Sequence, residues 1–204
     1  NSAYSRRLNY SGSNAAPGAQ LSAGMSRASA IGPLDRAGLP DPAGRYALIS
    51  IGMSNTTQEF QAFMPLAAAD PSKDSRLAIV DGAQGGQTAA DWANPGCACW
   101  TTLDSRLQQA GLTRAQVAVA WVKMANSQPS GGWPAATLQL EADTVRVMQA
   151  LAARFPNLRL AYLSSRIYAG YATTTLNPEP YAYQSGFAVR GAIEDQLTGL
   201  LPFS

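Results

Sequence analysis

Three short polar segments each follow an apolar run of strand length, and their residue types suit acyl-transfer chemistry. Ser54 lies in the first segment, Gly85 and Gly86 in the second, and Asn126 in the third. A serine hydroxyl can attack a carbonyl carbon. Backbone N–H groups and an asparagine carboxamide can then donate hydrogen bonds to the oxyanion that forms. Ser54 is therefore either a nucleophile on a sharp strand-to-helix turn or a polar residue that ends one element and begins the next.

The chemistry also needs a general base, and the sequence contains no histidine. A serine hydroxyl is a weak nucleophile unless a neighbouring group takes its proton, and histidine is the commonest group to do so. The other candidates by position at strand ends are Lys123, Asp81, Asp91 and Glu59. A lysine would need burial to lower its pKa, and a carboxylate is a weak base for serine.

The elements that must position these residues are predicted by alternating apolar and helical patterns. Nearly continuous apolar runs are typical of strands covered on both faces, and they occupy 45–52, 76–83, 117–125 and 158–165. Helical patterns occupy 57–68, 88–110 (broken), 136–155 and 186–198. The alternation predicts an α/β fold, a three-layer α/β/α sandwich with a parallel, flavodoxin-like sheet. Ligands bind beyond the carboxyl ends of such strands, where the polar segments lie.

The long helix over 136–155 is expected to face the core with one stripe of apolar residues at helical spacing. These residues are Leu138, Ala142, Val145, Met148, Ala152 and Phe155.

Residues 1–44 are rich in Ala, Ser, Gly and Pro and show no sustained period of 2 or 3.6. We expect an extended N-terminal arm over 1–44 and one domain over 45–204.

The three ordered segments resemble those of the SGNH, or GDSL-type, hydrolases. That family has a Gly-x-Ser block after its first strand, a glycine block after its second and an asparagine block after its third. The resemblance implies an α/β/α esterase, with acylated carbohydrate as a substrate class and no cofactor or metal. It implies that Ser54 is the nucleophile, and that its own N–H, Gly86 (or Gly85 in the alternative register) and Asn126 are the oxyanion donors.

The sequence departs from this family at its C-terminal side, where an Asp-x-x-His block, a fifth strand and a last helix are expected. Three explanations stay open. The chain is a fragment, it is a relative that lost catalysis and kept the scaffold for binding or assembly, or another residue is the base. Under the second explanation, the arm or an open sheet edge would engage neighbouring chains or a second copy.

Each candidate residue also has a structural interpretation. Ser54 could simply begin a helix in which Thr56 and Glu59 form a capping box. Gly85 and Gly86 could serve a tight turn. Asn126, before Ser-Gln-Pro, suits any loop.

A polar and aromatic segment follows the fourth predicted strand and is expected to overhang the mouth of the site. Its candidate substrate-binding residues are Arg166, Tyr168 and Tyr171. Tyrosine offers an apolar face and a hydroxyl that suit a sugar ring, and Arg166 could orient an anionic group. Alternatively, the tyrosines pack on the domain and Arg166 pairs with a carboxylate.

Composition argues against several classes of partner. A net charge of +2 without a basic run makes nucleic acid an unexpected partner. No run approaches the roughly 18 apolar residues that a membrane span needs. Cys97 and Cys99 are too few for a structural zinc site and are either free thiols or a local redox pair. The chain begins at Asn1 rather than Met, which fits a protein whose export signal has been removed, and the resemblance to the SGNH hydrolases implies a secreted bacterial protein.

Overall fold

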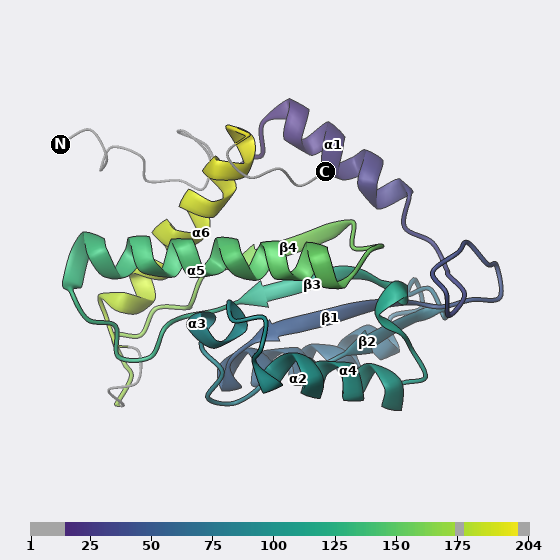
Figure 1. The fold of residues 1–204 in the computed structure, drawn as a ribbon, viewed down its shortest axis with the longest axis horizontal. Coiled ribbons are helices and arrows are strands. Elements are labelled where there is room, and N and C mark those ends of the chain that lie inside the picture. Colours follow the sequence, from purple (N-terminus) through teal and green to yellow (C-terminus); the bar gives the residue numbers. More distant parts are fainter. Residues whose placement is uncertain (1–14, 174–177, 200–204) are drawn as a thin grey trace.

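The computed structural model describes residues 15–173 and 178–199. Its sheet has four parallel strands in the order β2-β1-β3-β4, with their carboxyl ends at the left in Figure 1. The strands are β1 (Tyr46–Gly52), β2 (Leu77–Val80), β3 (Val117–Lys123) and β4 (Leu160–Ser164). All four lie where the apolar runs predicted them. β2 and β3 end earlier than predicted, because residues 81–83 and 124–125 have already left the sheet for the loops at its carboxyl end.

The helices complete a flavodoxin-like α/β/α fold, as predicted. They are α1 (Gly18–Ser29), α2 (Ser54–Ala69), α3 (Ala89–Trp92), α4 (Ala98–Gln109), α5 (Gly132–Arg154) and α6 (Tyr181–Leu197). In Figure 1, α3, α4 and α5 lie on the near face of the sheet and α2 lies on the far face. α6 packs along α5.

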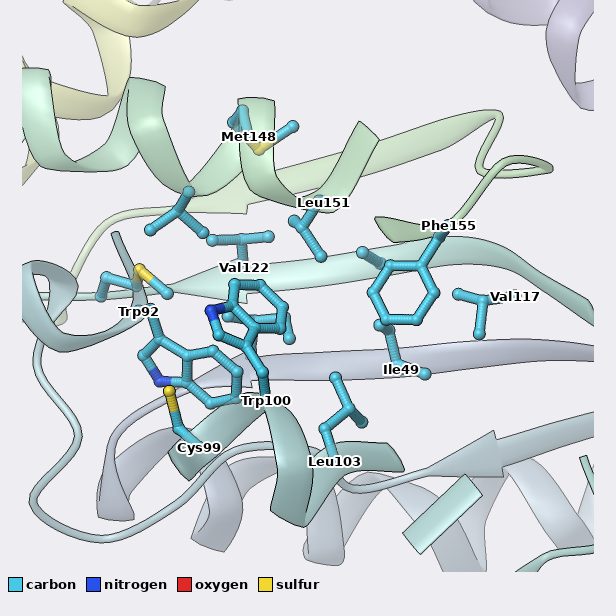
Figure 2. Packing of buried hydrophobic residues seen from close by; sticks show 14 of the residues in the cluster. Ile49, Trp92, Cys99, Trp100, Leu103, Val117, Val122, Met148, Leu151 and Phe155 are labelled. Atoms are coloured by element: carbon cyan, nitrogen blue, oxygen red, sulfur yellow. The ribbon is translucent and has the colours of Figure 1, made fainter. Parts of the chain in front are cut away.

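The near face carries the apolar core. The indole rings of Trp92 and Trp100 meet edge to face at 4.8 Å and fill the space between α3, α4 and the strands (Figure 2). Leu103 from α4 and Leu151 from α5 belong to the same buried cluster, and all four side chains are at most 2% exposed. Aromatic side chains of this size bury a large apolar area, so this face supplies much of the folding free energy.

The far face is more polar and is covered less completely. Phe60 of α2 stacks on Trp121 of β3 with ring centroids 5.9 Å apart. The register pairs Ser50 with Trp121, and Ser50 is buried although it is polar. Tyr162 on β4 is 58% exposed. The far face is therefore a single-helix layer over a sheet that contains polar groups.

The stripe predicted for α5 is wrong. Of its six members only Met148 and Phe155 are buried, and Leu138 is 57% exposed. The apolar residues buried on α5 are Ala136, Leu140, Val147, Met148 and Leu151. α5 packs against α3 and α6 as well as facing the sheet, so it buries a broad face, and its many alanines and valines did not mark which side that would be.

Of the arm predicted over 1–44, residues 1–14 lie outside the described residues, and the part from 15 to 44 is not wholly extended. Residues 18–29, expected to be part of an extended arm, form α1, none of whose residues is buried. Leu34 then forms antiparallel bridges with Pro40 and Arg45, which tie the segment to the start of β1. The sequence pattern missed α1 because its alanines are mixed with Gly and Ser, and its apolar Leu21 and Met25 stay exposed.

Candidate active site

The loops after β1, β2 and β3 are joined by hydrogen bonds at one corner of the sheet. The Gly52 carbonyl accepts from Gln84 N at 3.0 Å and from Trp92 Nε1 at 3.3 Å. Ala89 N donates to the Ala125 carbonyl at 3.0 Å, which joins the start of α3 to the loop after β3. Segments far apart in the chain therefore meet where the candidate residues lie.

Gly52 allows the loop after β1 to lie close to the end of β3 and the first turn of α2. A Cβ at this position would lie 2.2 Å from the Lys123 carbonyl oxygen and 2.3 Å from Thr56 Oγ1. Those two atoms are joined by a hydrogen bond of 2.7 Å from the Thr56 hydroxyl, which fastens the first turn of α2 to β3. Only glycine leaves room for the backbone there.

Ser54 is the first residue of α2 and its side chain is exposed. The first N–H groups of a helix lack intrahelical acceptors and create a positive potential, which favours negative charge on a nearby oxygen. The capping-box interpretation is wrong, because Thr56 and Glu59 both contact Lys123 instead. The helix also begins three residues before the predicted start, which places Ser54 within it.

Gly85 and Gly86 form the centre of a turn, as the structural interpretation predicted. Gln87 N donates to the Gln84 carbonyl at 3.2 Å, and Gly86 has φ +79°, the left-handed value that favours glycine. The turn also lies against the nucleophile candidate, since a Cβ on Gly85 would lie 3.7 Å from Ser54 Cβ. The alternative-register residue Gly85 is thus beside Ser54, and the donor role of Gly86 stays a prediction.

Hydrogen bonds at both the oxygen and the nitrogen of its carboxamide hold Asn126 in place. Its Oδ1 accepts from Ala90 N at 3.0 Å, and its Nδ2 donates to Asp143 Oδ2 at 2.8 Å. Ala90 belongs to α3, so Asn126 is part of the same corner as the Gly85 turn. That Asn126 Nδ2 and Ser54 Oγ face a common point stays a prediction.

Asp143 was missed by sequence reasoning. It lies on α5, is 2% exposed, and accepts hydrogen bonds from Gln139 and Arg146 as well as from Asn126. Arg146 Nη1 pairs with it at 2.8 Å. A charged residue on the buried side of a helix is a detectable signal. This signal did not identify Asp143, because the predicted apolar stripe placed the buried side of α5 on a different side of the helix.

Each candidate for a substitute base has a partner of its own. Lys123 is 3% exposed and forms an ion pair with Glu59. Asp81 Oδ1 accepts from Ser50 Oγ at 2.6 Å. Asp91 caps the N-terminus of α3 through Thr88. The side chains of all four residues therefore make contacts that hold parts of the fold together.

Arg166 reaches the N-terminus of α2. Its Nη1 donates to Asn55 Oδ1 at 3.0 Å, and its backbone N–H donates to Ser185 Oγ of α6 at 2.9 Å. Burial lowers the pKa of Arg166, and the charge of Glu59 raises it in part. The alternative that Arg166 pairs with a carboxylate is wrong for the described residues, where its side-chain acceptor is the neutral Asn55.

Tyr168 and Tyr171 are 68% and 91% exposed, so they do not pack on the domain. Their rings meet edge to face at 5.6 Å. The Glu179 carboxylate accepts from Ala169 N at 2.8 Å, which ties the segment to the start of α6. Binding of substrate by these tyrosines stays a prediction.

Cys97 and Cys99 form a disulfide at the start of α4. Within residues 15–173 and 178–199, no cluster of three or more metal-binding side chains occurs. No helix in the same ranges has the length and apolar character to cross a bilayer.

Comparison with known proteins adds no assignment to what the structure shows. No protein-family model and no curated protein matches the chain. Among solved structures it is similar to a gut microbial diltiazem-metabolizing enzyme, with 17% identity and a TM-score of 0.46. The match covers 76% of this chain and 34% of the other, so the chain spans about a third of that enzyme's length. At this identity and TM-score, the similarity assigns neither a family nor an activity.

Proposed function

We propose that this protein carries the nucleophile and oxyanion elements of an SGNH-type serine ester hydrolase. The observation that carries the proposal is the meeting of three distant loops at one corner, with the Gly85 turn against Ser54 and Asn126 tied to α3. Ser54 at the start of α2 adds the positive potential of a helix N-terminus.

In the proposed reaction, Ser54 Oγ attacks the ester carbonyl carbon and loses its proton to a base. The oxyanion accepts hydrogen bonds from Ser54 N–H, from the Gly86 or Gly85 N–H and from Asn126 Nδ2, which also donates to Asp143. The C–O bond to the alcohol then breaks, the alcohol leaves with the proton, and water hydrolyses the acyl-enzyme. Removal of one oxyanion donor costs roughly 10²- to 10³-fold in rate, so these groups account for much of the expected acceleration.

The base is proposed to be an imidazole that the 204 residues do not contain. Lys123, Asp81, Asp91 and Glu59 are all engaged elsewhere in the fold. A further segment or a partner chain would have to bring a histidine to the Ser54 corner.

The substrate class is proposed to be acylated carbohydrate, since Tyr168 and Tyr171 offer exposed aromatic faces near the carboxyl end of β4. A secreted location is part of this proposal. The Cys97–Cys99 disulfide supports it, because disulfides persist in oxidising compartments.

Chemical rescue with imidazole tests the proposal. Hydrolysis of 4-methylumbelliferyl acetate is followed with increasing imidazole in the wild-type chain, in Ser54→Ala and in Ser105→Ala. Ser105 is an exposed serine on α4 and serves as the matched control. We expect imidazole-dependent hydrolysis above the reagent background in the wild type and in Ser105→Ala, and none in Ser54→Ala.

The rival function is a non-catalytic binding or assembly protein on the same scaffold, and the absence of histidine from the sequence favours it. A natively folded wild-type chain whose hydrolysis equals that of Ser54→Ala at every imidazole concentration would support the rival and contradict the esterase proposal.

A further inference from the structure

Arg166 is a half-buried cation whose side chain has a neutral partner. Its guanidinium reaches Asn55, the residue after Ser54, and its backbone is fixed to α6 through Ser185. Arginine carries five N–H donors, and among the described residues only Nη1 donates to a protein acceptor. The remaining donors are available to a ligand.

The surrounding charges leave a positive balance at this position. The charge of Glu59 acts to raise the pKa of Arg166, but the Glu59 carboxylate is paired with the buried ammonium of Lys123. Two cations and one anion therefore lie together, beside the unpaired N–H groups of the first turn of α2. Burying a cation without a counter-ion is costly, and burial lowers the pKa of Arg166 for this reason. An anionic ligand group would relieve that cost.

A hollow beside Arg166 has room for the rest of a ligand. Its lining includes Glu59, Trp121 and Lys123 together with Ser165 and Ile167, the chain neighbours of Arg166, whereas Arg166 itself is not a lining residue. The hollow opens at the carboxyl ends of β3 and β4, where ligands bind in folds of this kind.

We infer that Arg166 and Asn55 form a carboxylate-binding subsite next to Ser54, so that the preferred substrates are esters that also carry a carboxylate. A single guanidinium matches one carboxylate in charge and in its planar, two-pronged geometry. As a statement about substrates, this inference rests on the proposed esterase function. Carboxylate binding itself needs no catalysis and can be measured separately.

The test is a titration of the folded chain with sodium succinate, followed by the NMR shifts of the Arg166 Nε–Hε group and the Asn55 side-chain amide. Succinamide, a neutral analogue of similar shape, is the ligand control. We expect saturable shifts with succinate that weaken as NaCl is added, and none with succinamide. Ser54→Ala should bind succinate like the wild type, which separates this inference from the fate of the catalytic proposal.

Two variants and one control localise the binding. Arg166→Gln should weaken succinate binding roughly tenfold or more. Asn55→Asp should also abolish it by giving Arg166 a carboxylate partner, and it remains informative if Arg166→Gln fails to fold. Arg76→Gln removes a cation that pairs with Asp74 at the other end of the sheet and should leave binding unchanged. Absence of saturable shifts in the wild type, or unchanged binding in folded Arg166→Gln or Asn55→Asp, would overturn the inference.

Discussion

The two faces of the sheet carry different kinds of side chain. The near face packs Trp92, Trp100 and Leu151 against the strands with almost no exposed surface (Figure 2). The far face holds the buried polar groups Ser50 and Lys123 under the single helix α2. The near face therefore provides stability, while the far face holds polar and charged groups near the carboxyl ends of the strands.

The buried polar groups of the far face have positioning roles. Ser50 Oγ accepts from Gly82 N at 3.0 Å and from Ala83 N at 3.1 Å, which orients the loop that leads to the Gly85 turn. Lys123 holds α2 through Glu59. Buried polar groups of this kind cost free energy to desolvate, so their presence at the loop ends indicates that loop geometry matters there.

The largest expected effect tests the near face. Leu151→Ala should lower the free energy of unfolding by about 3 to 4 kcal/mol, because it leaves a cavity in a fully packed region. Tyr162→Ala on the far face is the matched control and should cost less than about 1 kcal/mol, since its side chain is mostly exposed. Urea denaturation measures both. Similar losses for the two variants would contradict the difference between the faces.

The next effect tests the far-face ion pair. Glu59→Gln leaves the Lys123 ammonium buried without its counter-ion and should cost about 2 kcal/mol, below the full value for buried pairs because Glu59 is 41% exposed. Adding Lys123→Met should recover much of the loss. A double-mutant cycle by urea denaturation measures the coupling, and a coupling near zero would show that the pair does not fasten α2 to the sheet.

A smaller, pH-dependent effect on the free energy of unfolding tests the ion pairs of Asp104 on the near face. Asp104 of α4 binds Arg114 and Arg154. Burial acts to raise the pKa of Asp104, but hydrogen bonds from the two arginines outweigh it and lower the pKa below 3.8. A lowered carboxyl pKa stabilises the folded state above the unfolded value and loses that effect as the pH falls through the folded pKa.

Asp104→Asn should therefore destabilise the chain by about 1 kcal/mol at pH 7 and by progressively less below pH 3.8. Unfolding free energies from pH 7 to pH 3 measure this trend. A difference that stays constant over the whole range would mean that ionic contacts of Asp104 do not contribute.

The smallest effect has the opposite sign and concerns Glu141, between α5 and α6. Burial raises the pKa of Glu141 above 4.5, and the charges of Asp195 and Glu194 raise it further. A raised carboxyl pKa favours folding at low pH, and this advantage is lost as the pH rises through the folded pKa. Glu141→Gln should thus raise the melting temperature slightly at pH 7 and have no such effect near pH 4. A lower melting temperature at pH 7 would contradict this assignment.

The sequence predicted the near-continuous strands well, because residues such as Ile49 and Val122 lie in runs that only a strand covered on both faces requires. It did not predict the buried side of α5, where alanines and valines occur on several sides of the helix. Because of that error, the sequence did not predict Asp143 as a buried residue, nor the hydrogen bond by which Asp143 orients Asn126. The Lys123–Glu59 pair joins residues 64 apart in the chain, and no local pattern specifies such a contact.

The central claim is that Ser54 is the nucleophile at the corner where the three loops meet, and the site of fluorophosphonate labelling tests it most directly. The folded chain is incubated with the probe in the presence of imidazole, digested and mapped by tandem mass spectrometry. We predict one modified serine, Ser54, with no adduct in Ser54→Ala and an unchanged adduct in Ser105→Ala. A natively folded chain that stays unlabelled, or that is labelled at a different serine, would contradict the claim.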